Sequence, residues 1–237
     1  MSGPIHPLAT IDHFLRAAAP QLSEWAVRPQ SRLVWLCLGA IVAGGGVYGA
    51  AMGSWCAPLQ AVYVGIKLPL LILLTTIGNG LLNGMLAPLL GLKISFRQTQ
   101  TAVLLSFAIT SAILGALSPV ALFVVWNTPP LTGTTQSTSP EHCFLQLTLV
   151  VFIAVAGVVG NARLLPLLKQ WANRDAVARR VLFAWLAGNL FLGSQICWVL
   201  RPFLWVSAGR VVFIGPDSFH GSFYETVFEA ARRLLSP

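Results

Sequence analysis

The sequence has few charged residues, and acidic residues are especially scarce. Only 9% of its 237 residues are charged, and seven of them are Asp or Glu. Soluble domains carry about a quarter charged residues, so this composition excludes an ordinary soluble fold. The five long apolar stretches contain no acidic residue, which argues against transport coupled to a proton on an intramembrane carboxylate.

The residue spacings of metal sites and catalytic sets are also missing. No CxxC or HExxH spacing occurs, and the four His residues are scattered along the chain. No Ser-His-Asp set can be assembled from residues so far apart. We therefore predict no enzyme activity, no metal ion and no cofactor.

Long apolar stretches are what the sequence has in abundance, since 56% of its residues are hydrophobic. A membrane span needs about 20 mainly apolar residues. The stretches do not alternate polar and apolar residues, and unpaired strand backbone would be costly in lipid, so helices are expected. We predict an all-α integral membrane bundle of five helices, with an interfacial amphipathic helix at each end. The expected spans are residues 32–52, 60–88, 100–126, 143–163 and 181–201, with kinks at Pro69, Pro88 and Pro119.

The chain divides into three expected parts: an N-terminal segment (1–31), the bundle (32–201) and a tail (202–237). The N-terminal segment contains an amphipathic pattern at 10–27, which suits an interfacial helix. In the tail, Ser222 and Glu225 form a capping box. The helix that follows is predicted to lie on the membrane, fold over its own bundle or bind a partner. Its apolar face contains Phe223, Val227, Phe228 and Leu234.

The net charge of +8 does not predict nucleic-acid binding, because the basic residues follow the loops and no interleaved aromatic motif appears. The loops 53–59 and 127–142 contain no Lys or Arg, although Arg201 and the tail together contribute four Arg residues. The positive-inside rule then predicts a cytoplasmic N terminus and a C terminus across the membrane. Ten basic residues lie on the predicted inner side: Arg16, Arg28, Arg32, Lys93, Arg97, Arg163, Lys169, Arg174, Arg179 and Arg180.

Two pairs of residues are expected near the membrane surfaces. Cys56 and Cys143 fall at the outer ends of spans. They form either a disulfide, if that compartment is oxidising, or two unrelated buried thiols. Trp198 and Arg201 end the last span, where these residue types anchor a helix at the headgroups.

Among the polar residues within the apolar stretches, five are candidates for an intramembrane role: Lys67, Asn79, Asn83, Asn189 and Gln195. An intramembrane charge is costly, so Lys67 either reaches back to the interface or lines a substrate or proton path. Asn79 and Asn83 lie on one helical face, because residues four apart are neighbours on a helix. These amides either hold helices together or line the path of a solute.

Glycines at helical spacing predict close helix packing. Gly45, Gly49 and Gly53 form a double GxxxG pattern, and Gly80 and Gly84 adjoin the two Asn residues. Small residues let a neighbouring helix approach closely, within the chain or between copies.

The five closely connected helices and the Gly-rich first pair, with 65-GIKLPLLILL-74, resemble the Yip1-type family over most of residues 30–200. The resemblance implies a bacterial inner-membrane organiser, trafficking factor or assembly factor rather than an enzyme. We predict a non-catalytic scaffold or assembly subunit with a protein partner or a second copy of itself. The alternative is a small-solute or ion transporter that uses the five intramembrane polar residues. Their convergence on a hydrated cavity would favour the transporter.

Overall fold

The computed structural model describes residues 31–55, 57–129, 140–200, 213 and 222–235, and it confirms the all-α prediction. Five helical segments are long and apolar enough to cross a membrane, the fourth being Cys143–Trp171. The expected interfacial helix at 10–27 lies outside the described residues. The helices are α3 (Ser31–Gly53), α4 (Pro58–Leu89), α5 (Phe96–Trp126), α6 (Pro140–Ala162), α7 (Leu165–Trp171), α8 (Asp175–Leu200) and α9 (Phe223–Leu235).

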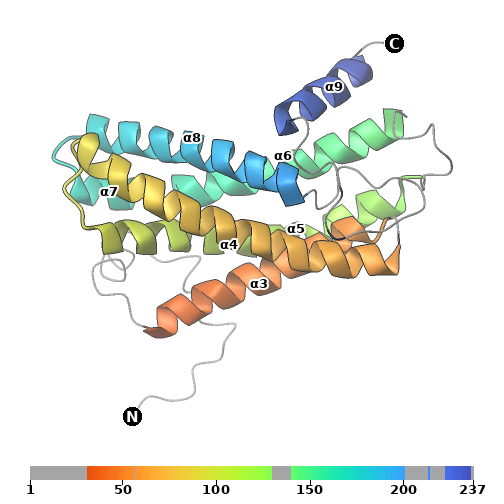
Figure 1. Ribbon diagram of the computed structural model, residues 1–237, viewed down its shortest axis with the longest axis horizontal. Helices are drawn as coiled ribbons and strands as arrows, with labels where there is room; N and C mark the ends of the chain where they lie inside the picture. The colour runs from red at the N-terminus through yellow and green to blue at the C-terminus, as the bar shows by residue number, and fades with distance from the viewer. Residues whose placement is uncertain (1–30, 56, 130–139, 201–212, 214–221, 236–237) are drawn as a thin grey trace.

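The long helices lie side by side and alternate in direction (Figure 1). Helix α3 packs on both α4 and α5, while α8 packs on the other side of α4 and α6 packs on α5. The short helix α7 packs against α8, and α9 covers one end of α6 and α8. Each of the five long helices therefore contacts at least two others.

Large apolar side chains cover much of the outer surface of the long helices. Val62, Ile77, Phe123 and Phe191 are 57%, 60%, 67% and 61% exposed. Such a surface is stable when it faces lipid, because hydrocarbon chains replace water around it. The protein is therefore a polytopic membrane protein embedded in a bilayer.

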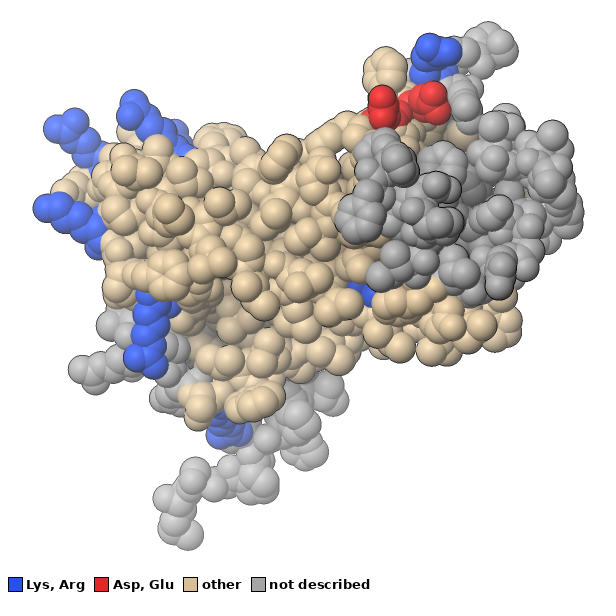
Figure 2. All heavy atoms as spheres, viewed as in Figure 1, with Lys and Arg blue, Asp and Glu red and all other residues tan. Residues whose placement is uncertain are grey.

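Basic side chains gather at one end of the bundle, and the middle of the face in Figure 2 is almost free of charge. At this end Lys169 and Asp175 form an ion pair of 2.6 Å across the short turn between α7 and α8. It is the end that the sequence predicts to be cytoplasmic, and that orientation stays a prediction. The described basic residues here are Arg32, Lys93, Arg97, Arg163, Lys169, Arg174, Arg179 and Arg180.

The turn between α4 and α5 is specified by local chemistry. Gly91 has a φ of +86°, a conformation that favours glycine, and Leu92 N–H donates to the Ala87 carbonyl at 2.9 Å. Ser95 and Gln98 then form a capping box at the start of α5, which we did not predict. Both long helices run continuously through their prolines, α4 through Pro69 and Pro88 and α5 through Pro119.

The glycines of α3 lie where its backbone meets two other helices. A Cβ atom on Gly49 would lie 2.5 Å from the Val64 carbonyl oxygen, and one on Gly53 would lie 2.6 Å from that of Gln60. Gly45 packs against Pro69 and Ile72. The double GxxxG face therefore lies against α4 of the same chain.

A second glycine contact joins α3 to α5. A Cβ atom on Gly44 would overlap the Ser111 carbonyl, and one on Gly115 would lie 2.9 Å from the Gly44 Cα atom. The sequence analysis missed this pair, because the two residues come from different spans. In α4, Gly80 and Gly84 lie against the Gln100 and Phe96 side chains of α5.

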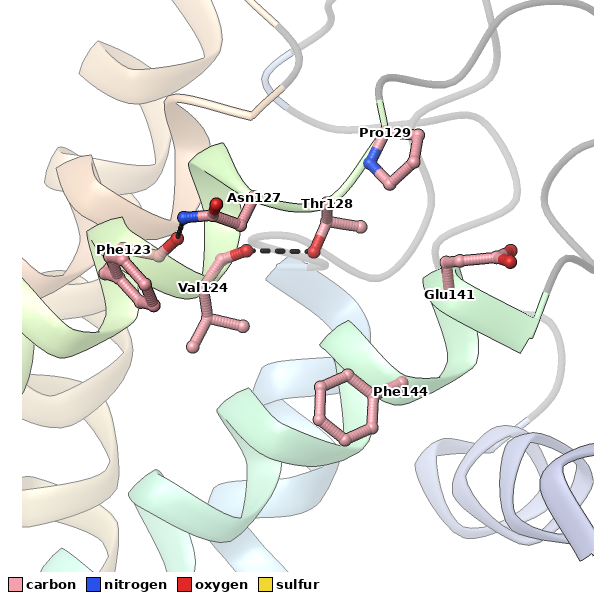
Figure 3. A pocket seen from close by; sticks show the side chains of 7 residues that line it. All are labelled: Phe123, Val124, Asn127, Thr128, Pro129, Glu141 and Phe144. Atoms are coloured by element: carbon pink, nitrogen blue, oxygen red, sulfur yellow. Dashed lines mark hydrogen bonds between the residues drawn. The ribbon is translucent and has the colours of Figure 1, made fainter.

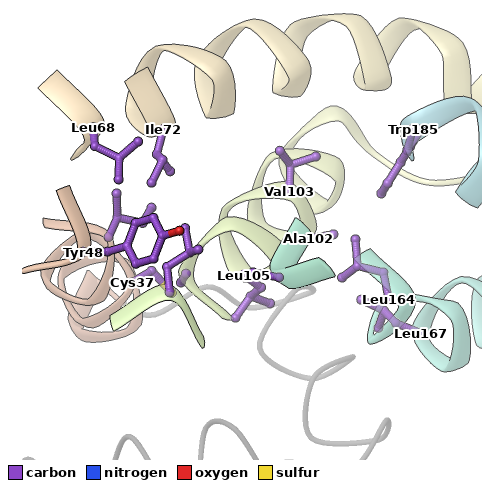
Figure 4. Close-up of a cluster of buried hydrophobic side chains, with 14 of the residues drawn as sticks. Cys37, Tyr48, Leu68, Ile72, Ala102, Val103, Leu105, Leu164, Leu167 and Trp185 are labelled. Atoms are coloured by element: carbon purple, nitrogen blue, oxygen red, sulfur yellow. The ribbon is translucent and has the colours of Figure 1, made fainter. Parts of the chain in front are cut away.

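The apolar core fills the space between the helices (Figure 4). Tyr48 of α3 is fully buried beside Leu68 and Ile72 of α4. Its hydroxyl donates to the Leu149 carbonyl of α6 at 3.3 Å. Trp185 enters the core from α8 and is also fully buried.

The glycine contacts predict different results for two substitutions in α3. Gly49→Ala should destabilise the protein by about 1–3 kcal/mol, because the new methyl group would overlap the backbone of α4. Gly39→Ala should be neutral or slightly stabilising, since no atom lies within 4 Å of the new Cβ and Ala has the higher helix propensity. Thermal unfolding in detergent measures both changes. Equal stability of the two variants would contradict the packing described here.

Candidate polar site inside the bundle

Two carboxamide side chains of α4 lie buried in the bundle without a hydrogen-bond partner. Asn79 and Asn83 are both 0% exposed. Among the described residues, neither the oxygen nor the nitrogen of either amide finds a partner. Both oxygens face Gly188 of α8, where a Cβ atom would lie 3.6 Å from Asn79 Oδ1 and 3.8 Å from Asn83 Oδ1. The absence of a side chain at Gly188 lets α8 approach these amides.

Helix α8 contributes two more unpaired polar groups beside Gly188. Trp185 is 0% exposed, and its Nε1 atom has no partner among the described residues. Asn189 Nδ2 donates to Asn161 Oδ1 of α6 at 2.8 Å, whereas Asn189 Oδ1 finds no partner in the described part of the chain. Residues 185, 188 and 189 share one helical face because they are separated by three and four positions.

Helices α5 and α6 complete the arrangement. Asn161 Nδ2 donates to the Gly157 carbonyl at 2.9 Å, and the neighbouring Gly160 lies against the Ser106 backbone of α5. The Ser106 side chain is 1% exposed and its hydroxyl is unpaired within the described structure. Contacts at Gly188 join α8 to the two amides of α4, the Asn161–Asn189 hydrogen bond joins α8 to α6, and the Gly160 contact joins α6 to the Ser106 backbone of α5. We use the name polar centre for the uncharged polar side chains linked in this way: Asn79, Asn83, Ser106, Asn161, Trp185 and Asn189.

The polar centre differs from the other polar positions within the long helices. Most buried Ser and Thr hydroxyls of α4 and α5 donate to carbonyls three or four residues earlier in their own helix, at 2.7–3.0 Å, as at Thr75, Thr76, Thr101, Ser111 and Ser118. These hydroxyls need no hydrogen-bond partner from a neighbouring helix. An amide left unpaired in a dry interior costs free energy, and intramembrane polar groups of this kind mark functional sites.

The five intramembrane residues singled out from the sequence do not all converge. Asn79, Asn83 and Asn189 meet in the polar centre. Gln195 is half-buried and lies six positions, about 9 Å, beyond Asn189 along α8. The sequence analysis missed Ser106, Asn161 and Trp185. Asn161 lies at the very end of the fourth predicted span, where a polar residue does not indicate a buried site.

Lys67 occupies a separate place, about 18 Å before Asn79 along α4. Its side chain is buried, and its Nζ atom lies 5.0 Å from the centroid of the Phe213 ring. Phe213 also makes an edge-to-face contact of 5.6 Å with Tyr63. Lys67 is therefore held by a cation–π contact and does not belong to the polar centre.

Helix α9 has folded over the end of its own bundle, one of the three arrangements left open by the sequence. Its cap forms as predicted, since Glu225 N–H donates to Ser222 Oγ at 3.3 Å. Tyr224 and Ser194 of α8 join through their hydroxyls at 2.9 Å. The expected apolar face is split: Phe223 and Val227 are half-buried, and Phe228 is 69% exposed. The side chain of Leu234 lies outside the described residues.

The remaining expectations concern the membrane surfaces. Trp198 is 7% exposed, so its side chain is largely covered by protein, and its role as an anchor at the headgroups stays a prediction. Arg201 lies outside the described residues.

The two cysteines expected near the outer surface were predicted to form either a disulfide or two unrelated thiols. Cys143 is a free, buried thiol and Cys56 lies outside the described residues, so the structure gives the disulfide no support. No group of three or more His, Cys, Asp or Glu in the described residues could hold a metal ion.

An open hollow of about 530 Å³ lies between the end of α5 and the start of α6 (Figure 3). Its polar side chains are largely satisfied, since Asn127 Nδ2 donates to the Phe123 carbonyl at 2.7 Å and Thr128 Oγ1 donates to that of Val124 at 2.9 Å. Glu141 is its one charged lining residue. The hollow therefore lacks the unpaired groups that distinguish the polar centre.

Substitutions of Asn by Leu test whether the amides are unpaired. Asn79→Leu and Asn83→Leu should raise the free energy of unfolding by about 1–3 kcal/mol, because they remove buried groups without partners. Asn161→Leu should lower it by a similar amount, because it leaves Asn189 Nδ2 unpaired. Denaturant titration in detergent measures these changes. Destabilisation by all three variants alike would show that the α4 amides are ordinary packing groups.

Comparisons with protein-family models, with curated proteins and with solved structures found no match to this chain. The resemblance to the Yip1-type family consequently stays a prediction. The function has to be argued from the polar centre itself.

Proposed function

We propose that this protein takes up a small polar solute at the polar centre and lets it cross the membrane. One observation carries the proposal: Asn79 and Asn83 are fully buried in a membrane bundle with all four amide atoms unpaired among the described residues. A buried polar group without a partner costs free energy. The presence of such groups here is explained if a solute forms hydrogen bonds with them during function. The proposed role is transport without catalysis. It is the transporter alternative rather than the scaffold.

The packing of α8 against α4 supports a route to the polar centre. At the α3–α4 and α3–α5 contacts, glycines bring backbone against backbone. At the α4–α8 contact, by contrast, Gly78 meets the Leu192 side chain. Side chains can change rotamer at lower cost than a close-packed backbone can move. Access is therefore proposed along the seam between α4 and α8.

The position of the polar centre along the bundle also suits a transport site. Asn79 lies ten positions, about 15 Å, before the end of α4, and Asn161 lies in the last turn of α6. The centre is nearer the end where the basic residues gather. With the N terminus in the cytoplasm, as the charge distribution predicts, the solute would meet the polar centre in the inner half of the membrane.

A scaffold role has one observation in its favour. Helix α9 presents Phe228, 69% exposed, and Tyr224, 42% exposed, at the end of the bundle. Aromatic side chains of this kind are common at protein contacts. A scaffold that uses this surface should retain a stoichiometric partner in mild detergent and lose it on the substitution Phe228→Asp.

Flux into liposomes tests the transport proposal. Purified protein reconstituted in liposomes should speed the equilibration of at least one small polar solute, measured by stopped-flow light scattering after mixing with urea, glycerol or potassium chloride. Asn79→Leu and Asn83→Leu should return the rate toward that of protein-free liposomes, because they remove the proposed binding groups.

Thr75→Val provides the matched control. Thr75 lies on α4 one turn from Asn79, and its hydroxyl already donates to the Leu71 carbonyl at 2.7 Å. This variant should keep the wild-type rate. Rates equal to those of protein-free liposomes for every solute would refute the proposal.

A further inference from the structure

The hydrogen-bonding groups left unpaired in the polar centre indicate which class of solute it accepts. Among the described residues the unpaired acceptors include the side-chain oxygens of Asn79, Asn83 and Asn189. The unpaired donors include the two amide nitrogens of α4 and Trp185 Nε1. Ser106 Oγ can act in either way. Donors and acceptors are thus present in similar number.

This balance distinguishes a neutral solute from an ion. A metal cation is bound by several oxygen atoms and has no use for an indole N–H, which only donates. An anion is bound by donors and cationic side chains, and the carboxamide oxygens would repel it. All six members of the polar centre are uncharged, and Lys67 lies about 18 Å away along α4. A neutral molecule that both donates and accepts can pair with every kind of group present.

The geometry at Gly188 limits the size of the molecule. A single methyl group placed there would be in van der Waals contact with both Asn79 Oδ1 and Asn83 Oδ1, at 3.6 and 3.8 Å. The slot between α8 and these oxygens is therefore about one methyl group deep. An amide or urea that enters edge-on can place its –NH2 group, which is about as large as a methyl group, in such a slot, whereas a branched polyol or a sugar cannot.

We propose that Asn79, Asn83 and Gly188 form a binding slot for a small, flat, neutral solute of the urea or acetamide type. Its N–H groups donate to the two carboxamide oxygens that face Gly188. Its carbonyl accepts from the donors of the polar centre. This inference rests on the proposed transport function and specifies the solute class of the same site.

Two glycines of α8, Gly188 and Gly193, provide a matched pair of variants. Gly188→Ala places a methyl group in the slot at ordinary contact distance, so the protein should fold normally while the space for the solute is filled. Gly193→Ala places the same methyl group 3.5 Å from Thr75 Cγ2, away from the two amides. Both variants gain the same helix propensity. A difference between them reports on the slot alone.

The experiment measures the flux of urea, acetamide, potassium ion and chloride into liposomes that contain wild-type protein or either variant. We expect urea and acetamide to enter faster than into protein-free liposomes, with no increase for the two ions. Gly188→Ala should reduce the protein-dependent urea flux by about tenfold, a typical effect of one misplaced carbon in a binding pocket. Gly193→Ala should leave it unchanged.

The outcomes separate this inference from the function on which it rests. Flux of potassium or chloride without urea or acetamide would overturn the neutral-solute inference and leave transport standing. Equal urea flux in both Ala variants would overturn the slot at Gly188. The absence of protein-dependent flux for all four solutes would overturn both.

Discussion

In the hydrocarbon of a membrane, a polar group has to find its hydrogen-bond partner inside the protein, because lipid offers none. This constraint accounts for most of the structure. It makes the spans helical, so that each backbone group pairs within its own helix. It also turns the Ser and Thr hydroxyls of α4 and α5 back onto carbonyls of the preceding turn. Between helices it pairs Asn161 with Asn189. Asn79 and Asn83 stand out because all four of their amide atoms lack a partner among the described residues.

Helices α3, α4, α5 and α6 are joined by close backbone contacts, whereas α8 meets α4 through side chains. Glycines bring the backbone of α3 against those of α4 and α5, and Gly160 brings α6 against α5. Overpacking any of these contacts would displace a whole helix. Helix α8 meets α4 through side chains and through the gap at Gly188. The amides thus lie at a contact made through side chains and a glycine rather than through close backbone packing.

Hydropathy predicted the five spans well, since apolar length is the main requirement for crossing a membrane. The predicted and observed ends differ most at the fourth span, expected to end at 163 and found to continue to Trp171, and at α8, expected from 181 and found to begin at Asp175. Its first turns contain Arg179 and Arg180 and remain helical outside the apolar stretch. Helices α4 and α5 each run without a break through the prolines at which kinks are expected.

The polar centre was predicted only in part. The spacing of Asn79 and Asn83 placed them on one face, which depends on local geometry alone. Which other residues meet that face depends on how the helices are arranged, and hydropathy contains no such information. Lys67 was grouped with the amides although it contacts Phe213 near the other end of α4. Ser106, Asn161 and Trp185 went unnoticed because each is unremarkable within its own span.

The most direct test of the central claim is a crystal structure grown in a lipid phase, at a resolution that shows ordered water. The account predicts electron density between Asn79, Asn83 and Gly188, from water or a small solute hydrogen-bonded to both amides. It would be contradicted by a dry contact at Gly188 with both carboxamides turned to bond carbonyls or side chains of the neighbouring helices. In that case the amides would be packing groups, and the functional site would have to be sought elsewhere.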